Sequence, residues 1–135
     1  MKLSGTPVSA AYIKLTIELM KQWGAQVVYN EQLIQVAEGT YTTHKPLSME
    51  ADWSAASYWY AMVSAIPGSR VSMPGLNIHS AQGDRVVAAW MRFFGVETLA
   101  NEAGCTAVSG NLPVASDFEQ DFSSYPDLVP TFVVT

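Results

Sequence analysis

An internal repeat constrains the fold of this chain more than any other feature of its sequence. Shifted by 71 residues, the chain matches itself in constant register: Trp23-Gly24 falls on Phe94-Gly95, and Asn30-Glu31 falls on Asn101-Glu102. A repeat of this kind indicates copies of one supersecondary unit. We therefore expect both copies to form the same succession of elements.

In each copy the pattern of apolar residues predicts a helix followed by two strands. Apolar residues recur at helical spacing in 12–23 and again in 85–94. Gly24 and Gly95 follow these helices, where a left-handed residue is favoured. Two short strands joined at the Asn-Glu pair come next, over 25–29 and 33–39 in the first copy and over 96–100 and 105–110 in the second.

The residues between the copies belong to the second one. They predict a strand over 44–51, a helix from Asp52 to Ile66 and a strand over 69–75, so the complete unit is β-α-β-α-β-β over about 45–110. The first copy holds only α-β-β, and a third unit opens over 115–135. The expected fold class is α/β (α+β) with repeated units incomplete at both ends, divided at 1–43 and 44–135.

The stretch from Trp53 to Ile66 carries no charge. It is shorter than the ~20 residues that a membrane-spanning helix needs, and Pro-Gly-Ser follows it at once. We expect no membrane segment here. A helix that is apolar all round is predicted to be buried on nearly every side.

Composition excludes some classes of function. The net charge is −5 with seven Lys and Arg residues, which argues against a nucleic-acid partner. One cysteine, Cys105, cannot form an internal disulfide, which is typical of a reducing cytoplasm. His44 and His79 share no ligand spacing with it, so no metal site is expected. Cys105 is interpreted as a small buried apolar residue.

Four motifs carry a family resemblance, in order and with fitting spacings over essentially the whole chain. The segment MEADWSAASYWYAMVSAIPGSRVSMPGL resembles the Glu-Gly-Asp-x-Ser-Ser-Ala-Ser-Tyr segment of the 5-enolpyruvylshikimate-3-phosphate synthase family. The other three are SAQGD, VSAAYIKLTIELMKQWG and YPDLVPT, which are similar to the family's Ser-x-Gln-Gly-Asp, Ser-basic-Pro-Tyr-Ile and Pro-Asp-x-x-Pro-Thr segments.

The resemblance implies a fold of two domains, each built from three units around buried helices, with the chain crossing between domains near GTYTTHKPLSM. It implies transfer of the enolpyruvyl group of phosphoenolpyruvate to the 5-hydroxyl of shikimate 3-phosphate, in a monomeric cytoplasmic parent without metal or organic cofactor. Most of the family's basic phosphoenolpyruvate ligands lie outside this span. The 135 residues alone are therefore expected to be inactive.

The resemblance also assigns site residues. Asp127 matches an aspartate that binds the ring hydroxyls of shikimate 3-phosphate and moves the proton of the 5-hydroxyl, whereas its sequence alone is equally consistent with a helix-start aspartate. Ser9 matches a serine on the substrate phosphate, and Tyr12 lines the same pocket; otherwise Ser9 is an ordinary N-cap. Ala10 and Ala11 stand where the family has a basic residue and proline.

Other polar residues near helix starts have plainer interpretations. Asp52 and Asp84 are predicted to cap the helices that follow them. Glu50 is consistent with either a cleft or solvent, and Gln82 is expected to shape a turn. Two alternatives remain: a fragment of the sister enzyme, UDP-N-acetylglucosamine enolpyruvyl transferase, and a non-catalytic domain built from the same unit.

Overall fold

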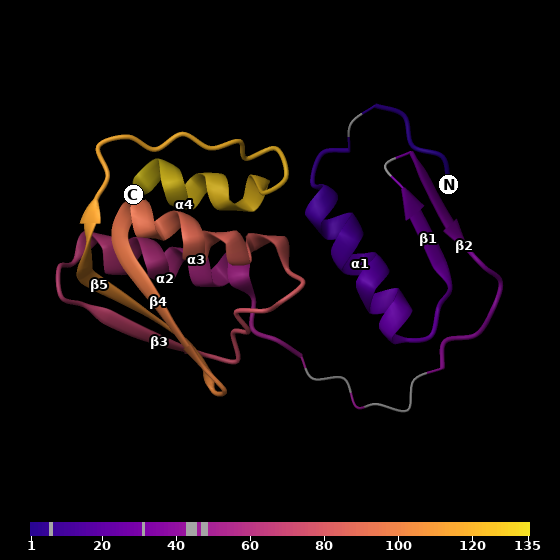
Figure 1. The fold of residues 1–135 in the computed structure, drawn as a ribbon, viewed down its shortest axis with the longest axis horizontal. Helices are drawn as coiled ribbons and strands as arrows, with labels where there is room; N and C mark the ends of the chain where they lie inside the picture. Colours follow the sequence, from indigo (N-terminus) through magenta and orange to yellow (C-terminus); the bar gives the residue numbers. More distant parts are fainter. Residues whose placement is uncertain (6, 31, 43–45, 47–48) are drawn as a thin grey trace. The chain divides into compact units, whose positions relative to one another are not determined.

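The computed structural model describes residues 1–5, 7–30, 32–42, 46 and 49–135. The chain forms two compact units, Met1–Ser48 and Met49–Thr135. In each unit a helical segment leads directly into an antiparallel hairpin, α1 into β1-β2 and α3-η2 into β4-β5, as the repeat predicts (Figure 1).

The first unit consists of α1 (Ala10–Gln22), β1 (Val27–Asn30) and β2 (Leu33–Val36). The two strands pair antiparallel, and Lys2 adds an isolated bridge to Leu33 on the outer edge of β2. Ile17 of α1 is its one deeply buried apolar side chain among the described residues. This unit therefore has a thin core of mostly half-exposed side chains.

The end of α1 follows the predicted glycine signal. Gly24 has φ 87°, its N–H donates to the Lys21 carbonyl, and the N–H of Ala25 donates to the Met20 carbonyl, which together form a Schellman motif. Gly95 has φ 76° at the matching position of the second copy. The predicted glycine at the end of α1 is confirmed, whereas Gly95 follows Phe94, the C-cap of a 3-10 turn, and is the second residue of the next strand.

The hairpin turns also repeat. The Oδ1 atom of Asn30 accepts a hydrogen bond from the N–H of Gln32 at 3.1 Å, and Oδ1 of Asn101 accepts one from Ala103 at 2.8 Å. An asparagine side chain that bonds the backbone two residues on stabilises a tight turn. The repeated asparagine therefore has the same physical role in both copies.

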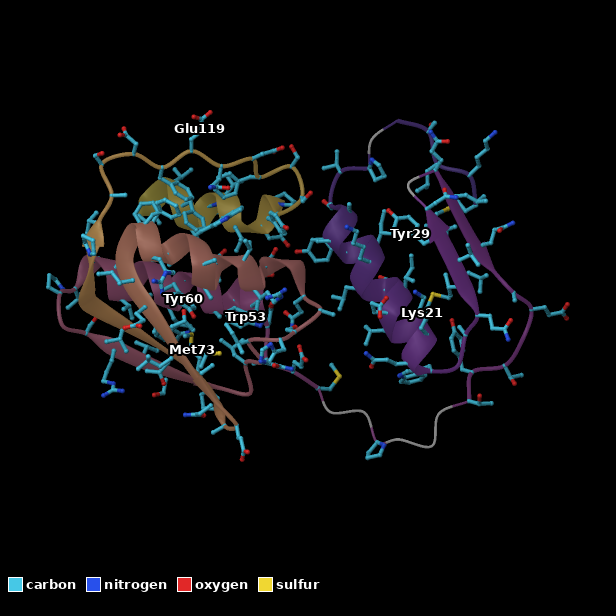
Figure 2. The ribbon with its side chains drawn as sticks, in the orientation of Figure 1. Lys21, Tyr29, Trp53, Tyr60, Met73 and Glu119 are labelled. Atoms are coloured by element: carbon cyan, nitrogen blue, oxygen red, sulfur yellow. The ribbon has the colours of Figure 1, made fainter. Side chains whose placement is uncertain are left out.

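The second unit packs helices on a three-stranded antiparallel sheet with strand order β3-β5-β4. Helix α2 contacts all three strands and both later helices, so it is the central element. The core lies mainly between α2, α3 and the sheet, and Figure 2 shows Trp53, Tyr60 and Met73 inside it. The elements are α2 (Trp53–Ala65), β3 (Arg70–Pro74), η1 (Gly83–Val86), α3 (Val87–Trp90), η2 (Met91–Phe93), β4 (Phe94–Asn101), β5 (Gly104–Val114), η3 (Pro126–Leu128) and α4 (Val129–Val134).

The predicted regular helix over 85–94 is wrong in detail. The segment is one short turn of α-helix, α3, between the two 3-10 turns η1 and η2. The β-branched Val86 and Val87 restrict the side-chain rotamers that a regular helix allows. Val87 and Met91 are fully enclosed, so tertiary packing decides the backbone here.

The strand predicted over 44–51 is not found in its described residues, 46 and 49–51. Residues 44, 45, 47 and 48 lie outside the described part of the chain. The N–H of Ala51 donates to the carbonyl of Gly75, which lies just beyond the end of β3. One such bond does not make a ladder, because a strand needs successive paired residues.

Helix α2 begins and ends where the sequence predicts, but its expected burial on nearly every side is wrong. Tyr58, Trp59 and Met62 are 51%, 50% and 55% exposed. They lie at helical spacing, so they form one apolar stripe opposite the buried stripe. An uncharged sequence therefore does not tell which face of a helix is buried by the rest of the fold and which face stays exposed.

Candidate functional site

Ser9 and Tyr12 lie together at the start of α1. Ser9 has φ 59° and ψ 35°, and it is the one non-glycine residue with positive φ among those described. Its carbonyl accepts a hydrogen bond from the N–H of Tyr12 at 3.0 Å, and its hydroxyl does not cap the helix. Tyr12 is 38% exposed. Ser9 therefore precedes the helix as predicted, but it does not cap it through its side chain.

Asp127 lies on the surface of the second unit, in η3 immediately before α4. Pro126 starts this turn, and its fixed φ suits a helix start. Ser9 and Tyr12 belong to the first unit and Asp127 to the second. The predicted site residues therefore form two separate groups, one at each helix start.

The neighbours of Asp127 are firmly packed although its carboxylate is exposed. Leu128, the next residue, has no exposed surface, and neither has Thr131 of α4. The Tyr125 ring lies edge-on to the Trp90 ring, with centroids 5.4 Å apart. Asp127 is thus an exposed carboxylate between the half-buried Pro126 and the fully buried Leu128.

A cluster of aromatic rings holds the segment that leads to Asp127. Residues 115–125 have no helix or strand. Phe118 and Phe122 point into the cluster, whereas Glu119 between them points outward (Figure 2). Phe118 and Phe122, four residues apart, thus attach this segment to the core. The ring cluster comprises Trp90, Phe93, Phe94, Phe118, Phe122, Tyr125 and Phe132.

Asp52 caps α2, as predicted. Its Oδ1 atom accepts a hydrogen bond from the N–H of Ser54 at 2.8 Å. Gln82 satisfies a second N–H of the same helix end, because its Oε1 atom accepts from the N–H of Trp53 at 2.9 Å. Both groups occupy N–H donors that an anionic ligand would need. The N-terminus of α2 is therefore capped by side chains of the protein, which argues against a phosphate site there.

Glu50 takes part in the network at the same helix end. Its Oε2 atom accepts from the hydroxyl of Ser80 at 2.5 Å, and its Oε1 atom accepts from the amide of Asn77 at 3.2 Å. The side-chain amide of Gln82 donates to the Ala51 carbonyl at 2.9 Å. These bonds join the chain before α2 to the loop after β3. No local sequence pattern predicts this pairing, because its members are 27–32 residues apart.

The prediction that Asp84 caps its own helix is wrong. Gln82 holds the N-cap position of η1, and no side chain caps that turn. The Asp84 side chain is 3% exposed, and its Oδ2 atom accepts from the hydroxyl of Ser54 at 2.5 Å. Asp84 therefore joins η1 to α2. The carboxylate points inward because η1 packs against α2. Its partner, Ser54, is 30 residues away, so the residues around Asp84 do not predict the bond.

Two buried titratable groups have perturbed acidity. Burial raises the pKa of Tyr60 to about 12, although the hydrogen bond from Thr98 opposes the shift. The two hydroxyl oxygens are 2.8 Å apart. Burial also raises the pKa of the Cys105 thiol, whose Sγ atom lies 3.6 Å from the Leu76 carbonyl. Cys105 is thus a buried residue, as predicted, and its raised pKa disfavours the reactive thiolate.

The described residues contain no group of three His, Cys, Asp or Glu side chains that could hold a metal ion. His44 lies outside them. Within the same part of the chain, no helix is long and apolar enough to cross a bilayer.

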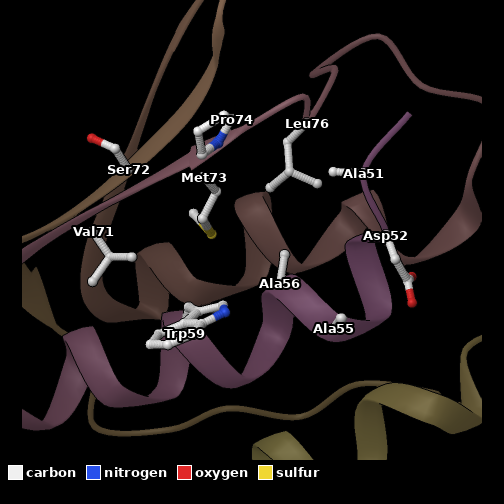
Figure 3. A pocket seen from close by; sticks show the side chains of 10 residues that line it. All are labelled: Ala51, Asp52, Ala55, Ala56, Trp59, Val71, Ser72, Met73, Pro74 and Leu76. Carbon is white, nitrogen blue, oxygen red and sulfur yellow. The ribbon is translucent and has the colours of Figure 1, made fainter. Parts of the chain in front are cut away.

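A groove of about 380 Å³ lies between α2 and β3 (Figure 3). Met73 and Val71 point from β3 toward α2, and Trp59 of α2 forms the opposite wall of the groove. Asp52, at one end, is its one charged lining residue, and this carboxylate already caps α2. An apolar groove with one acidic group does not suit anionic phosphate esters. None of Ser9, Tyr12 and Asp127 lines it.

Comparison with known proteins decides the family. The model of the family described as EPSP synthase (3-phosphoshikimate 1-carboxyvinyltransferase) matches residues 1–135. The chain belongs to the EPSP synthase family. A 3-phosphoshikimate 1-carboxyvinyltransferase of Bacteroides fragilis is 40% identical over 136 residues, which cover 100% of this chain and 33% of that protein.

Two further EPSP synthase relatives support the match. The Methanospirillum hungatei protein is 38% identical over 87 residues, 62% of this chain and 20% of its own length. The Vibrio cholerae protein is 31% identical over 138 residues, 100% of this chain and 31% of its own length. The chain thus spans about a third of the Bacteroides fragilis and Vibrio cholerae proteins, and its match covers a fifth of the Methanospirillum hungatei protein.

Proposed function

We propose that this chain is part of a 3-phosphoshikimate 1-carboxyvinyltransferase, which transfers the enolpyruvyl group of phosphoenolpyruvate to the 5-hydroxyl of shikimate 3-phosphate and releases phosphate. The observation that carries the proposal is the family match over the whole chain, together with the 40% identity to a protein of that name. We place the reaction in the cytoplasm, with a monomeric protein that uses no metal or organic cofactor.

In this proposal the two units are parts of two domains. Residues 1–43 would end the first domain, and residues 44–135 would begin the second. Shikimate 3-phosphate would contact Ser9 and Tyr12 from the first domain and Asp127 from the second. The division of the chain into two compact units supports this arrangement.

Asp127 is proposed to accept the proton of the 5-hydroxyl. As that oxygen bonds to the carbon of phosphoenolpyruvate that carries the phosphate ester, the C=C bond opens and the methylene carbon takes up a proton. Loss of a proton from the resulting methyl group then re-forms the C=C bond as the C–O bond to phosphate breaks. A carboxylate within hydrogen-bond reach contributes about 10²–10⁴ in rate as a general base. The exposed position of Asp127 on a firmly packed segment supports this role, because the base must reach the substrate without moving.

Ser9 is proposed to contact the substrate phosphate. Its hydroxyl is not used to cap α1, and its left-handed backbone is an unfavourable conformation for a residue with a side chain. Strain of this kind is often retained at binding sites. Ala10 and Ala11 remove the positive charge that the family has here, so the serine hydroxyl and helix N–H groups carry more of the phosphate contact.

A coupled phosphate-release assay tests the proposal on the full-length protein that contains this chain, with both substrates present. We expect phosphate release that requires both substrates, a loss of about 10²–10⁴ in kcat for Asp127→Asn, and no turnover by the 135 residues alone. Phosphate release without shikimate 3-phosphate would contradict the proposed reaction. Full activity of Asp127→Asn would contradict the proposed base.

A further inference from the structure

Two hydroxyl groups bond to each other inside the core, between α2 and α4. The Oγ atom of Ser57 and the Oγ1 atom of Thr131 are 2.6 Å apart, and both residues have 0% exposed surface. The residues are 74 positions apart in the chain. A polar pair with no access to water is stable only when the two groups meet each other. The pair therefore favours one position of α4 along α2. Apolar contacts specify such a position less strictly, because they have no preferred direction.

Proton counting gives the direction of this bond. The Ser57 hydroxyl donates to the Ser54 carbonyl at 2.7 Å, one turn earlier in α2. A serine hydroxyl has one proton and two acceptor lone pairs. Ser57 thus accepts from Thr131, whose hydroxyl is the donor of the pair. Removing the Thr131 hydroxyl removes the link between the helices, whereas the bond within α2 remains.

Thr131 follows Asp127 by four residues on a stiff segment. Pro126 and Pro130 flank Leu128 and Val129, and each proline fixes one backbone dihedral. Since the Asp127 carboxylate is exposed, burial does not fix its position directly. The anchors of its neighbours contribute to its position, and the hydrogen bond between Thr131 and Ser57 is the directional one among the anchors described above.

We propose that Thr131, held by Ser57, is a positioning residue for Asp127: the hydroxyl pair sets where the carboxylate stands relative to the substrate. This inference rests on the proposed role of Asp127 as the proton acceptor. Misplacing a reacting group by about 1 Å costs on the order of 10²-fold in rate. The pair acts on the chemical step through the backbone of η3 and α4, without touching substrate.

The test uses the full-length protein with Thr131→Val, which keeps the shape of the side chain and removes the hydroxyl. We expect kcat to fall about 10- to 100-fold, with little change in KM for phosphoenolpyruvate. Thr131→Ser keeps the hydroxyl and should retain most of the activity. Ser57→Ala removes the acceptor from the other helix and should lower kcat in the same way, so the test does not depend on the folding of one variant.

Ser64→Ala is the matched control. Its hydroxyl donates to the Ala61 carbonyl at 2.7 Å, just as Ser57 bonds Ser54, and it lies on the same helix. Ser57 differs from Ser64 in its bond to α4 and in its complete burial, since Ser64 is half-buried. We expect Ser64→Ala to keep the wild-type kcat.

A double variant separates positioning from general loosening of the fold. In the Asp127→Asn background, adding Thr131→Val should cause no further loss of the residual turnover, because the residue that it positions is already disabled. A full additional loss there would overturn the inference, as would wild-type kcat in folded Thr131→Val and Ser57→Ala. Those results leave the proposed function standing. An active Asp127→Asn would instead refute the proposed base and the inference with it.

Discussion

Replacing Trp90 with alanine should destabilise the second unit severely. The Trp90 ring lies edge-on to four other rings, with centroid distances of 5.1 Å to Phe122, 5.4 Å to Tyr125, 5.6 Å to Phe132 and 6.2 Å to Phe118. All four distances fall within the favourable range for aromatic pairs. Trp90 is therefore the centre through which the otherwise irregular segment 115–125 attaches to the core.

The magnitude follows from burial. Trp90 is 9% exposed, and a buried tryptophan truncated to alanine loses about 3–5 kcal/mol through lost transfer energy and the cavity that remains. Trp59 offers a matched control, because it is 50% exposed and its removal from the groove opens no enclosed cavity. We expect Trp59→Ala to cost roughly 1 kcal/mol, about half the transfer value of a large apolar side chain.

Urea unfolding followed by far-ultraviolet circular dichroism measures both variants without relying on tryptophan fluorescence. With a slope of about 2 kcal/mol per molar urea, the midpoint for Trp90→Ala should fall by roughly 2 M and that for Trp59→Ala by about 0.5 M. A midpoint for Trp90→Ala no lower than that for Trp59→Ala would refute the reasoning. It would mean that the rings repack around the gap and that Trp90 is not the anchor of the segment.

Two further predictions concern capping and titration. Asp52→Ala should lower the free energy of unfolding by about 0.5–2 kcal/mol, seen as a lower melting temperature, because the Ser54 N–H loses its cap; a large loss of kcat at unchanged stability would instead give Asp52 the role proposed for Asp127. The pKa of Tyr60 is raised to about 12 in the folded chain from 10.0, so the folded state holds this proton more tightly. Stability is full below pH 10 and falls as the pH rises from 10 to 12, by about 1.4 kcal/mol per unit. Tyr60→Phe should flatten this alkaline limb in urea titrations, whereas Tyr58→Phe, at a 51% exposed position, should not.

The sequence by itself determined the features that depend on a few neighbouring residues. The glycine-ended helix, the asparagine turns at Asn30 and Asn101 and the Asp52 cap are all found as predicted. Each is a local arrangement in which one side chain or one unusual dihedral satisfies backbone groups within five residues. A repeat in the sequence therefore translates directly into a repeat of helix and hairpin.

Tertiary structure decided the features that depend on residues far apart in the chain. Asp84 bonds Ser54 across 30 residues instead of capping its own turn, and Thr131 bonds Ser57 across 74. The exposed stripe of α2, which includes Trp59, follows from the side on which the sheet and later helices pack. Composition gives no sign of these outcomes, because a hydroxyl, a carboxylate or an indole takes its partner from whatever the fold brings beside it.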